Sequence, residues 1–362
     1  MKKIFFTCGP SQLYPTVEKH IQKALNNNIP SLSHRSVKFQ EIYKSTQDKL
    51  RKFLRIPKGH HIFFLASSLE SMERIIENCV DKHSFHFVNG AFSRKFYQFA
   101  KMLKKRPLKY EAADGKGFDV NKIKIPKNSE LICVTHNETS TGVSIPLQYI
   151  NKLKSDSSRL IAVDIVSSVP YVKIDFSKVD ITFFSVQKGF GLPAGMGVLL
   201  VNERAINKAN FLAKKGNNIG SYHSFLSFLD KDKIFQTPET PNVLSIYLLG
   251  KVLDDMLEKG IDTIRKEIEE KAKLVYGFFD NHSRYIPFVI DKNFRSKTTI
   301  VIDVKGKAKE IVKKLTKIGF IVSSGYGQFK ASHIRIANFP AHTIGNCKRL
   351  LSNFFPFSNY GD

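Results

Sequence analysis

Short apolar runs alternate with segments of helical spacing between about residue 60 and residue 202. One helical segment is LESMERIIENCV, in which apolar residues recur every three or four positions from Leu69 to Val80. Runs of strand length that alternate with helices are typical of a mostly parallel sheet with helices on its faces. The pattern therefore predicts an α/β fold, with strands at HIFFLAS, SFHFVN, LICVTH, LIAVDIV, ITFFSVQ and GVLLVN.

A second unit is predicted from about residue 243 onward. A long helical pattern there leads into the strand-like runs TTIVIDV, GFIVSSG and HIRIAN, which surround another helical segment. Because 362 residues exceed the length at which a single core usually stops growing, we expect two domains. We place a large domain at residues 16–245 and a smaller α+β domain at residues 246–362, with the N-terminal segment 1–15 packing against the smaller one.

The chain is strongly basic, with 57 Lys and Arg against 32 Asp and Glu and a net charge of +25. Such a charge attracts phosphates, so a basic nucleic-acid-binding protein on a vestigial fold is one alternative. The lysines, however, occur singly or in short groups on the outer faces of predicted helices. This distribution favours solvated surfaces, and we expect neither nucleic acid nor membrane as a partner.

The cysteines and the N-terminus indicate a reducing compartment. The four cysteines are far apart, with no CxxC pair that would suggest zinc or a disulfide framework. Gly9 and Pro10 end the N-terminal apolar run well short of a signal-peptide core, and no later run is long enough to span a bilayer. We therefore expect a cytoplasmic protein without a metal site.

Polar residues follow several predicted strands, at the sheet edge where open α/β folds bind ligands. Ser67 and Ser68 follow the first run and open the helical segment described above. Glu70, three residues after Ser67, suggests a capping box, whereas a phosphate at the helix N-terminus would use the same geometry. On these residues alone both interpretations of the serines stay open.

Asp164 and Lys188 are the second feature of this edge. Asp164 ends a run apolar enough to be buried, where a lone carboxylate needs a cation or a strong donor. Lys188 follows 24 residues later, about one strand–connection–strand unit, so both side chains can emerge at the same edge. A partly desolvated lysine there would have the lowered pKa that an imine-forming nucleophile needs.

The glycine-rich stretch after Lys188, GFGLPAGMG, fits neither a dinucleotide-binding nor a P-loop pattern, because it leads into a strand. We expect a turn that lets backbone approach a bulky cofactor. A phosphate site, a buried carboxylate and a strand-end lysine together indicate pyridoxal phosphate. Lys188 would hold its aldehyde as an imine, and Asp164 would keep its pyridine nitrogen protonated.

These residues resemble a known family, the class V aminotransferases of fold type I, and within it the phosphoserine aminotransferases most closely. The resemblance runs through nearly the whole chain. It rests on eight segments in order: FTCGPSQLYPTV, SLSHRSVKF, VNGAFSRKF, HNETSTG, VDIVSS, SVQKGFG, TPETPN and HIRIANFPAHT. It implies fold type I, with a mostly parallel seven-stranded sheet in a large domain and a smaller α+β C-terminal domain.

The resemblance also implies roles at the centre of the site. Lys188 would bind the cofactor covalently and move the substrate Cα proton, and Asp164 would pair with the pyridinium. Phe92 would stack on the cofactor ring, and Thr139 would bond near the phenolic oxygen of that ring.

Side chains from two subunits of a homodimer would hold the anionic groups. The cofactor phosphate would be bound by Ser67, Ser68 and Gln187, joined by Gln236 and Thr237 from the other subunit. Arg335 would bind the substrate α-carboxylate, which a planar guanidinium does well. His34 and Arg35 would meet the anionic group at the far end of the substrate.

The implied activity is transfer of an amino group from an amino acid, expected to be glutamate, to a 2-oxo acid. Phosphoserine:2-oxoglutarate transamination in serine biosynthesis is the expected reaction. Ser68 stands about where those enzymes carry an arginine, and Phe92 replaces their stacking Trp, since the chain has no tryptophan. NGAFSRKF and HNETSTG resemble instead the alanine–glyoxylate and serine–pyruvate branch, which is the alternative. A cysteine desulfurase is disfavoured, because Cys347 lies in the predicted final helix.

Overall fold

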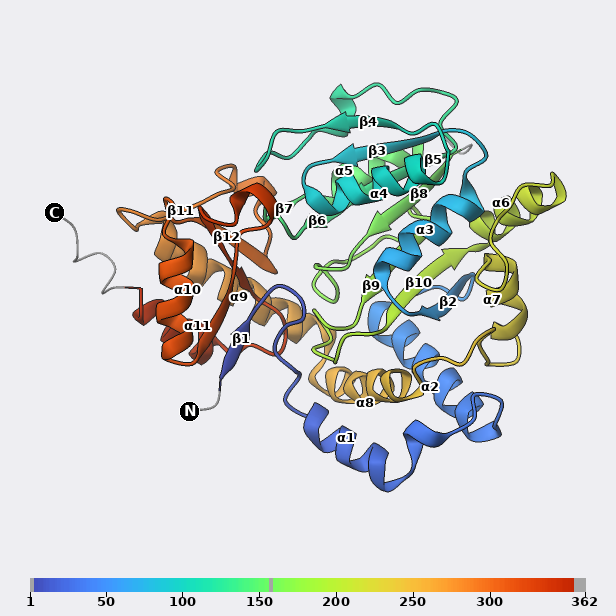
Figure 1. Cartoon of the computed structure of the whole chain (residues 1–362), viewed down its shortest axis with the longest axis horizontal. Coiled ribbons are helices and arrows are strands. Elements are labelled where there is room, and N and C mark those ends of the chain that lie inside the picture. The colour runs from blue at the N-terminus through green and yellow to red at the C-terminus, as the bar shows by residue number, and fades with distance from the viewer. Residues whose placement is uncertain (1–2, 156–158, 355–362) are drawn as a thin grey trace.

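The computed structural model describes residues 3–155 and 159–354, and its larger part is built on one mixed sheet (Figure 1). Within those residues this sheet has seven strands, in the order β2-β10-β9-β8-β5-β3-β4. Neighbours are parallel except β10, which runs antiparallel to both β2 and β9. The strands are β2 (His60–Leu65), β3 (Ser84–Val88), β4 (Leu108–Glu111), β5 (Leu131–Thr135), β8 (Leu160–Asp164), β9 (Ile181–Ser185) and β10 (Gly197–Asn202).

All six apolar runs predicted as strands before residue 202 are strands of this sheet, which confirms the α/β prediction. The edge strand β4 was not predicted. Its four residues, LKYE, are all exposed and pair only with β3. Leu108 and Tyr110 alternate with charged residues, but an alternation of only four residues is too short to predict a strand.

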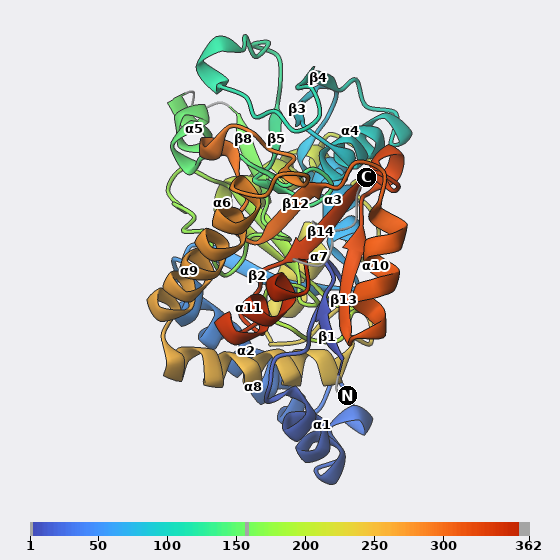
Figure 2. The same ribbon diagram turned by 90° about the vertical axis from the view of Figure 1, so that its left-hand side faces the viewer.

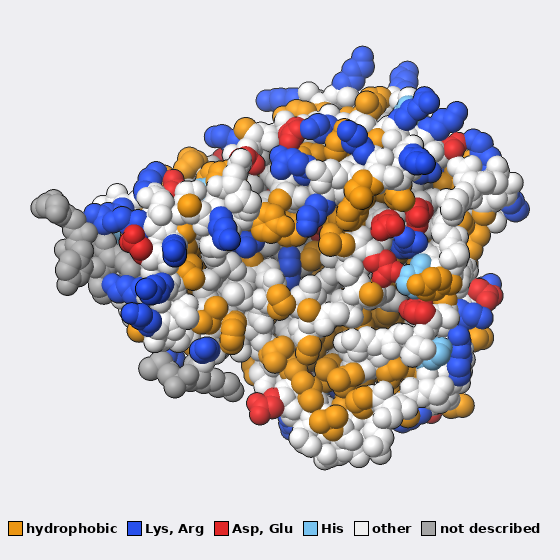
Figure 3. Space-filling model, viewed as in Figure 1, with side chains coloured by type: hydrophobic (Ala, Val, Ile, Leu, Met, Phe, Trp, Pro, Cys, Tyr) orange, Lys and Arg blue, Asp and Glu red, His pale blue; other side chains and the backbone are white. Residues whose placement is uncertain are grey.

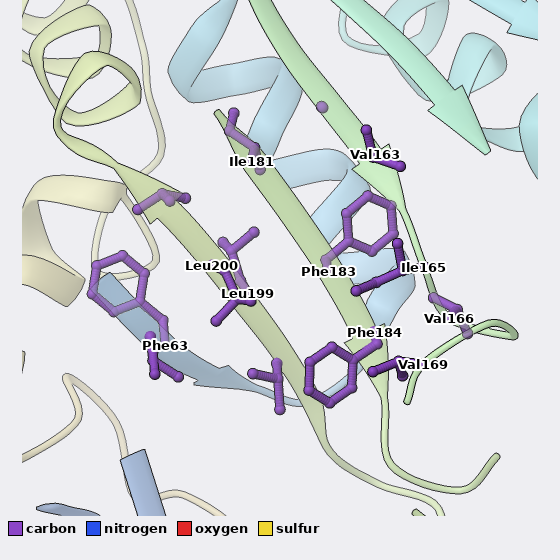
Figure 4. Close-up of a cluster of buried hydrophobic side chains, with 14 of the residues drawn as sticks. Phe63, Val163, Ile165, Val166, Val169, Ile181, Phe183, Phe184, Leu199 and Leu200 are labelled. Carbon is purple, nitrogen blue, oxygen red and sulfur yellow. The ribbon is translucent and has the colours of Figure 1, made fainter. Parts of the chain in front are cut away.

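The central strands of this sheet are buried on both faces. Helices α3 (Ser68–Cys79), α4 (Ala91–Met102) and α6 (Glu203–Lys214) cover one face (Figure 1). Phe183 and Phe184 are adjacent on β9, so their side chains point to opposite faces, and both are fully buried in the cluster of Figure 4. A strand covered on both faces must be apolar throughout, which explains the unbroken run ITFFS.

A second sheet forms the other part of the molecule. In the described residues it has five strands, in the order β1-β13-β14-β12-β11, with β1 parallel to β13 and the other pairs antiparallel. Three helices face the viewer in Figure 2 and share one core with this sheet. The elements are β1 (Ile4–Phe6), β11 (Ile286–Pro287), β12 (Thr299–Asp303), β13 (Phe320–Ser324), β14 (His333–Ala337), α9 (Ile261–Asp280), α10 (Ala308–Lys317) and α11 (Ile344–Ser352).

The remaining elements connect the two sheets or flank them. They are α1 (Val17–Asn26), η1 (Ile29–Ser31), α2 (Val37–Leu54), η2 (Val120–Lys122), β6 (Asn137–Glu138), β7 (Val143–Ser144), α5 (Leu147–Lys152), η3 (Leu153–Ser155), α7 (Phe225–Asp232), α8 (Val243–Lys259), η4 (Lys292–Phe294) and η5 (Gly327–Phe329). Across residues 3–155 and 159–354, no helix has the length and apolar character needed to cross a bilayer.

The domain division stays a prediction. Its boundary, between residues 245 and 246, falls inside α8, and buried side chains of α8 on both sides of the boundary belong to the core of the larger sheet. At the other end of the chain, β1 lies in the second sheet, beside β13. The chain therefore starts in the smaller sheet, crosses to the larger one and returns.

Candidate active site

The carboxyl ends of β5, β8 and β9 bring the predicted central residues to one edge of the larger sheet. These three strands are parallel neighbours, and in their register Thr135 lies beside Asp164, which lies beside Phe183. The segments that follow β5 and β9 carry Thr139 and Lys188. The sheet topology thus places Asp164 and Lys188 at the same edge, as their spacing predicts.

Lys188 is held almost out of water, with 7% of its surface exposed. Its Nζ donates a hydrogen bond to Oγ1 of Thr139 at 3.0 Å and lies 5.3 Å from the centroid of the Phe92 ring. Burial lowers the pKa of the Lys188 amine, and the nearby Asp164 carboxylate opposes that shift. The amine is therefore closer to its neutral, nucleophilic form than a surface lysine is.

Asp164 is a buried carboxylate behind this lysine. Its Oδ1 accepts a hydrogen bond from the backbone N–H of Val166 at 2.8 Å. Burial raises the pKa of Asp164 to about 7, against the opposing effects of that hydrogen bond and of the Lys188 charge. A carboxylate in this position would be stabilised by a positively charged partner placed against it.

Glu138 has no role in the sequence prediction, although it lies in the HNETSTG segment. The structure buries it completely beneath the N-terminus of α4. Its carboxylate accepts hydrogen bonds from the backbone N–H and hydroxyl of Ser93 at 2.9 Å, and from the corresponding groups of Ser140 at 3.1 and 2.7 Å. A negative charge at a helix N-terminus is favourable, so Glu138 fixes the start of α4, where Phe92 lies.

The start of α3 shows the capping interaction that Ser67 and Glu70 predict, and phosphate binding there stays a prediction. Ser67 is the N-cap, and its Oγ accepts a hydrogen bond from the N–H of Glu70 at 3.1 Å. The Glu70 carboxylate reaches back to the N–H of Ala66, so the box is displaced by one residue from the usual reciprocal pair. Ser68 donates its N–H to Oγ of Ser185, at the end of β9. The cap lies beside the strand ends, where a phosphate could also bind.

The glycines after Lys188 make close contacts with the chain's own backbone, while the expected approach of this turn to a cofactor stays a prediction. A Cβ on Gly189 would lie 1.8 Å from the carbonyl oxygen of Val169. Gly191 has φ +60°, and a Cβ there would lie 2.6 Å from the nitrogen of Tyr14. Both positions need glycine so that the Lys188 turn can pack against neighbouring segments.

The N-terminal segment also reaches Lys188, which the sequence analysis did not foresee. Gly9 has φ +134°, and a Cβ there would be 2.8 Å from Cε of Lys188. The preceding Cys8 donates its N–H to Oγ of Ser323 on β13, while Ser11 donates its N–H to the carbonyl of Gln187. Residues 8–11 therefore bridge the second sheet and the lysine turn. The only sequence feature that pointed to this contact was the segment FTCGPS, part of the family resemblance.

Arg335 enters the site from β14 of the second sheet. Its Nε donates a hydrogen bond to the carbonyl of Ser324 at 2.9 Å, and its Nη1 reaches the carbonyl of Thr139 at 3.5 Å. The guanidinium lies over the ring of Tyr326, with Cζ 5.4 Å from the ring centroid. Tyr326 was missed because no sequence pattern distinguishes it from other aromatic residues in turns.

Four predicted residues form a second group. Arg35 donates hydrogen bonds from Nη1 to Oε1 of Gln236 at 2.6 Å and to the carbonyl of Thr237 at 3.1 Å. His34 precedes Arg35, and its pKa is lowered by burial and by the Arg35 charge. Over the residues the structure describes, no hydrogen bond joins these four side chains to Lys188, Asp164 or Thr139. The predicted site residues thus fall into two groups on one chain.

Comparisons with known proteins agree on one family. A family model described as aminotransferase class-V matches residues 4–337. The phosphoserine aminotransferases of Rhodococcus opacus and Rhodococcus jostii are each 25% identical over 342 residues, which cover 93% of this chain and 90% of the relative. The crystal structure of a phosphoserine aminotransferase from Cytophaga hutchinsonii is 48% identical and covers 99% of both chains, with a TM-score of 0.96.

Substitution of Gly9 tests the contact between the N-terminal segment and the lysine. In Gly9→Ala, the added Cβ should displace the Lys188 side chain and strain a backbone at positive φ, lowering turnover by roughly a hundredfold. Gly59→Ala is the matched control, because nothing lies within 4 Å of a Cβ at that exposed glycine. Steady-state kinetics of both variants would decide; equal activities would contradict the proposed contact.

A histidine between two carboxylates should make the free energy of unfolding fall as the pH becomes alkaline. His223 forms ion pairs with Glu70 and with Glu239, the latter at 3.1 Å. Burial alone would lower the pKa of His223, but the two carboxylates outweigh it and raise the pKa to about 9.

Because the folded-state pKa lies above the unfolded value, this stabilisation is fully present below pH 6.5 and is lost as the pH rises through about 9. Urea unfolding at fixed protein concentration should show wild type more stable than His223→Gln at pH 6 and the two nearly equal at pH 10. A difference that stays constant across this range would contradict the assignment.

Proposed function

The chain belongs to the class-V aminotransferases, and from this membership we propose that it is a phosphoserine aminotransferase of serine biosynthesis. It would transfer the amino group between phosphoserine and 2-oxoglutarate. As a member of this family it is an enzyme that depends on pyridoxal phosphate. The main structural support for this chemistry is the buried Lys188 amine, which donates a hydrogen bond to Thr139 and lies near the buried Asp164. The substrate is supported by the 48% identity to a protein described as a phosphoserine aminotransferase.

Two features of the site support the fit of this cofactor. The buried Asp164 carboxylate, with its pKa raised to about 7, would gain a counter-charge from a protonated ring nitrogen. Gln187, which precedes Lys188, has a buried Oε1 without a hydrogen-bond partner among the described residues. Rotation of that amide presents its NH2 group to a phosphate instead, since the two orientations fill the same volume.

Bound pyridoxal phosphate supplies an aldehyde that exchanges amines and a ring that withdraws electrons from the substrate Cα. Lys188 would hold the cofactor through its amine, and the same amine would act as the base and acid that moves the Cα proton. Its lowered pKa suits that task, because a base must be largely unprotonated at the working pH. Thr139 accepts a hydrogen bond from Nζ and would lie near the phenolic oxygen of the cofactor, and Phe92, whose ring lies beside Nζ, would stack on the cofactor ring.

The anionic groups have separate binding sites. The hydroxyls of Ser67 and Ser68 at the start of α3, together with Gln187, would bind the cofactor phosphate. Arg335 binds the substrate α-carboxylate with the edge of its guanidinium that Ser324 leaves free. This division places the substrate Cα between Arg335 and Lys188.

The second group of residues serves the site of another subunit, so the working unit is a homodimer. In each subunit Gln236 and Thr237 face the partner's cofactor phosphate, while His34 and Arg35 face the far anionic group of the partner's substrate. Support comes from the Arg35 hydrogen bonds, which hold this group together. It also comes from exposed apolar side chains nearby, Val37, Leu69, Tyr222 and Ile234.

The surface supports the same assembly. Hydrophobic side chains gather on the lower part of the face shown in Figure 3, around α2 and α8. Leu69, predicted as part of the packed face of its helix, is among the exposed residues, and a partner subunit would cover it. All four cysteines are free and buried, which supports a reducing, cytoplasmic location.

Amino transfer with defined substrate pairs tests the substrate. The purified protein with pyridoxal phosphate should convert phosphoserine and 2-oxoglutarate with a kcat/KM at least about a hundredfold above alanine and glyoxylate. Lys188→Ala should abolish nearly all turnover, whereas Lys127→Ala, at an exposed lysine, should not change it. Preference for alanine and glyoxylate would overturn the substrate, and an active Lys188→Ala would overturn the mechanism.

Mixing of inactive subunits tests the shared site. Co-expression of Lys188→Ala with a His34→Ala, Arg35→Ala double variant should restore about a quarter of wild-type activity, since half of randomly paired dimers carry one intact site. Lys188→Ala paired with Arg335→Gln is the control, because both lesions lie in the same group and no intact site can form. Absence of recovery in the first pair, with each variant inactive alone, would contradict a shared site.

A further inference from the structure

Tyr326 lies between two residues that have substrate and cofactor roles. Its ring centroid is 5.2 Å from that of Phe92, and the planes are tilted by 45°. Arg335 places Cζ 5.4 Å from the centroid of the same ring. Both distances are typical of favourable aromatic and cation–π contacts. Tyr326 thus connects a helix start of the larger sheet with a strand of the smaller one.

The turn that carries Tyr326 is firmly placed. A Cβ on Gly325 would lie 1.9 Å from the carbonyl oxygen of Phe329, so the backbone of the turn closes directly over this glycine. Phe329 stacks on His333 at 4.6 Å. Gln328 donates a hydrogen bond from Nε2 to Oδ2 of Asp114, which belongs to the larger part of the molecule. The position of the Tyr326 ring is therefore set by the fold on either side of it.

The arrangement leaves one edge of Arg335 available. Ser324 accepts the Nε hydrogen bond, and Cζ of the guanidinium lies over the face of the Tyr326 ring. No hydrogen bond is made by Nη2 within residues 3–155 and 159–354. A guanidinium held through Nε and packed over an aromatic ring keeps the plane of its remaining N–H groups fixed, and a carboxylate needs that plane for two parallel hydrogen bonds.

We propose that Tyr326 is a positioning residue for the substrate: its ring face holds the Arg335 guanidinium in the plane that binds the α-carboxylate. The inference rests on the proposed role of Arg335 in substrate binding. Because every amino-acid and 2-oxo-acid substrate has that carboxylate, the effect is the same for both halves of the reaction. The ring acts through its face, so the hydroxyl of Tyr326 is dispensable.

The test uses the holoenzyme with L-glutamate as the varied substrate. Tyr326→Leu, which keeps the bulk of the side chain but removes the ring face, should raise KM roughly tenfold and change kcat less than about threefold. Tyr326→Phe should restore KM to within about twofold of wild type. Lys330→Ala, at an exposed lysine in the same turn, is the matched control and should leave KM unchanged. Cofactor absorbance and melting temperature show whether each variant is folded and loaded.

The same measurements in an Arg335→Gln background separate the two levels of the proposal. If Arg335→Gln leaves KM unchanged, the substrate role of Arg335 fails. If Arg335→Gln raises KM but Tyr326→Leu does not, the inference on Tyr326 alone fails. If Tyr326→Leu raises KM by the same factor with and without Arg335, the ring does not act through the guanidinium. Loss of its effect in the Arg335→Gln background is the expected result.

Discussion

Removal of a lysine amine and an aspartate carboxylate from water at one sheet edge is the constraint on which the rest of this structure depends. Charged groups tolerate burial only when partners replace the lost water. Here the surrounding strands are apolar on both faces, and the parallel register sets Asp164 beside the segment that leads to Lys188. Thr139 and the neighbouring carboxylate supply the partners. The same burial that costs stability gives the two groups their altered pKa values.

The groups around this centre come from segments far apart in the chain. Glu138 fixes the start of α4 and so the place of Phe92, while Arg335 and Tyr326 come from the second sheet. The N-terminal residues 8–11 contact both parts, through Ser323 on one side and Gln187 on the other. The relative position of the two sheets is thus built into the site, because each sheet contributes side chains that are useful only together.

The sequence predicted the larger sheet well and the contacts across the site poorly. Strands such as ITFFS can be predicted because burial on both faces requires an apolar run. The edge strand LKYE alternates apolar and charged residues over only four positions, so it was missed. Asp164 and Lys188 were found from strand-end position alone. Glu138 and Tyr326 were not assigned, since their roles arise from segments brought together by folding. The glycines near Lys188 were noticed, but the backbone atoms that leave no room for a Cβ there come from distant segments and are identified only in the folded structure.

The pairing of β1 with β13 has a consequence for the order in which the molecule is built. Ile4 pairs with Phe320, and the hydrogen bond between Cys8 and Ser323 spans 315 residues. During synthesis β1 leaves the ribosome long before its partner strand β13. All strands of the larger sheet lie before residue 203, so they can pair with one another earlier in synthesis. The residues around Lys188 are therefore completed only after the second sheet has formed. Until then a growing chain has an incomplete site.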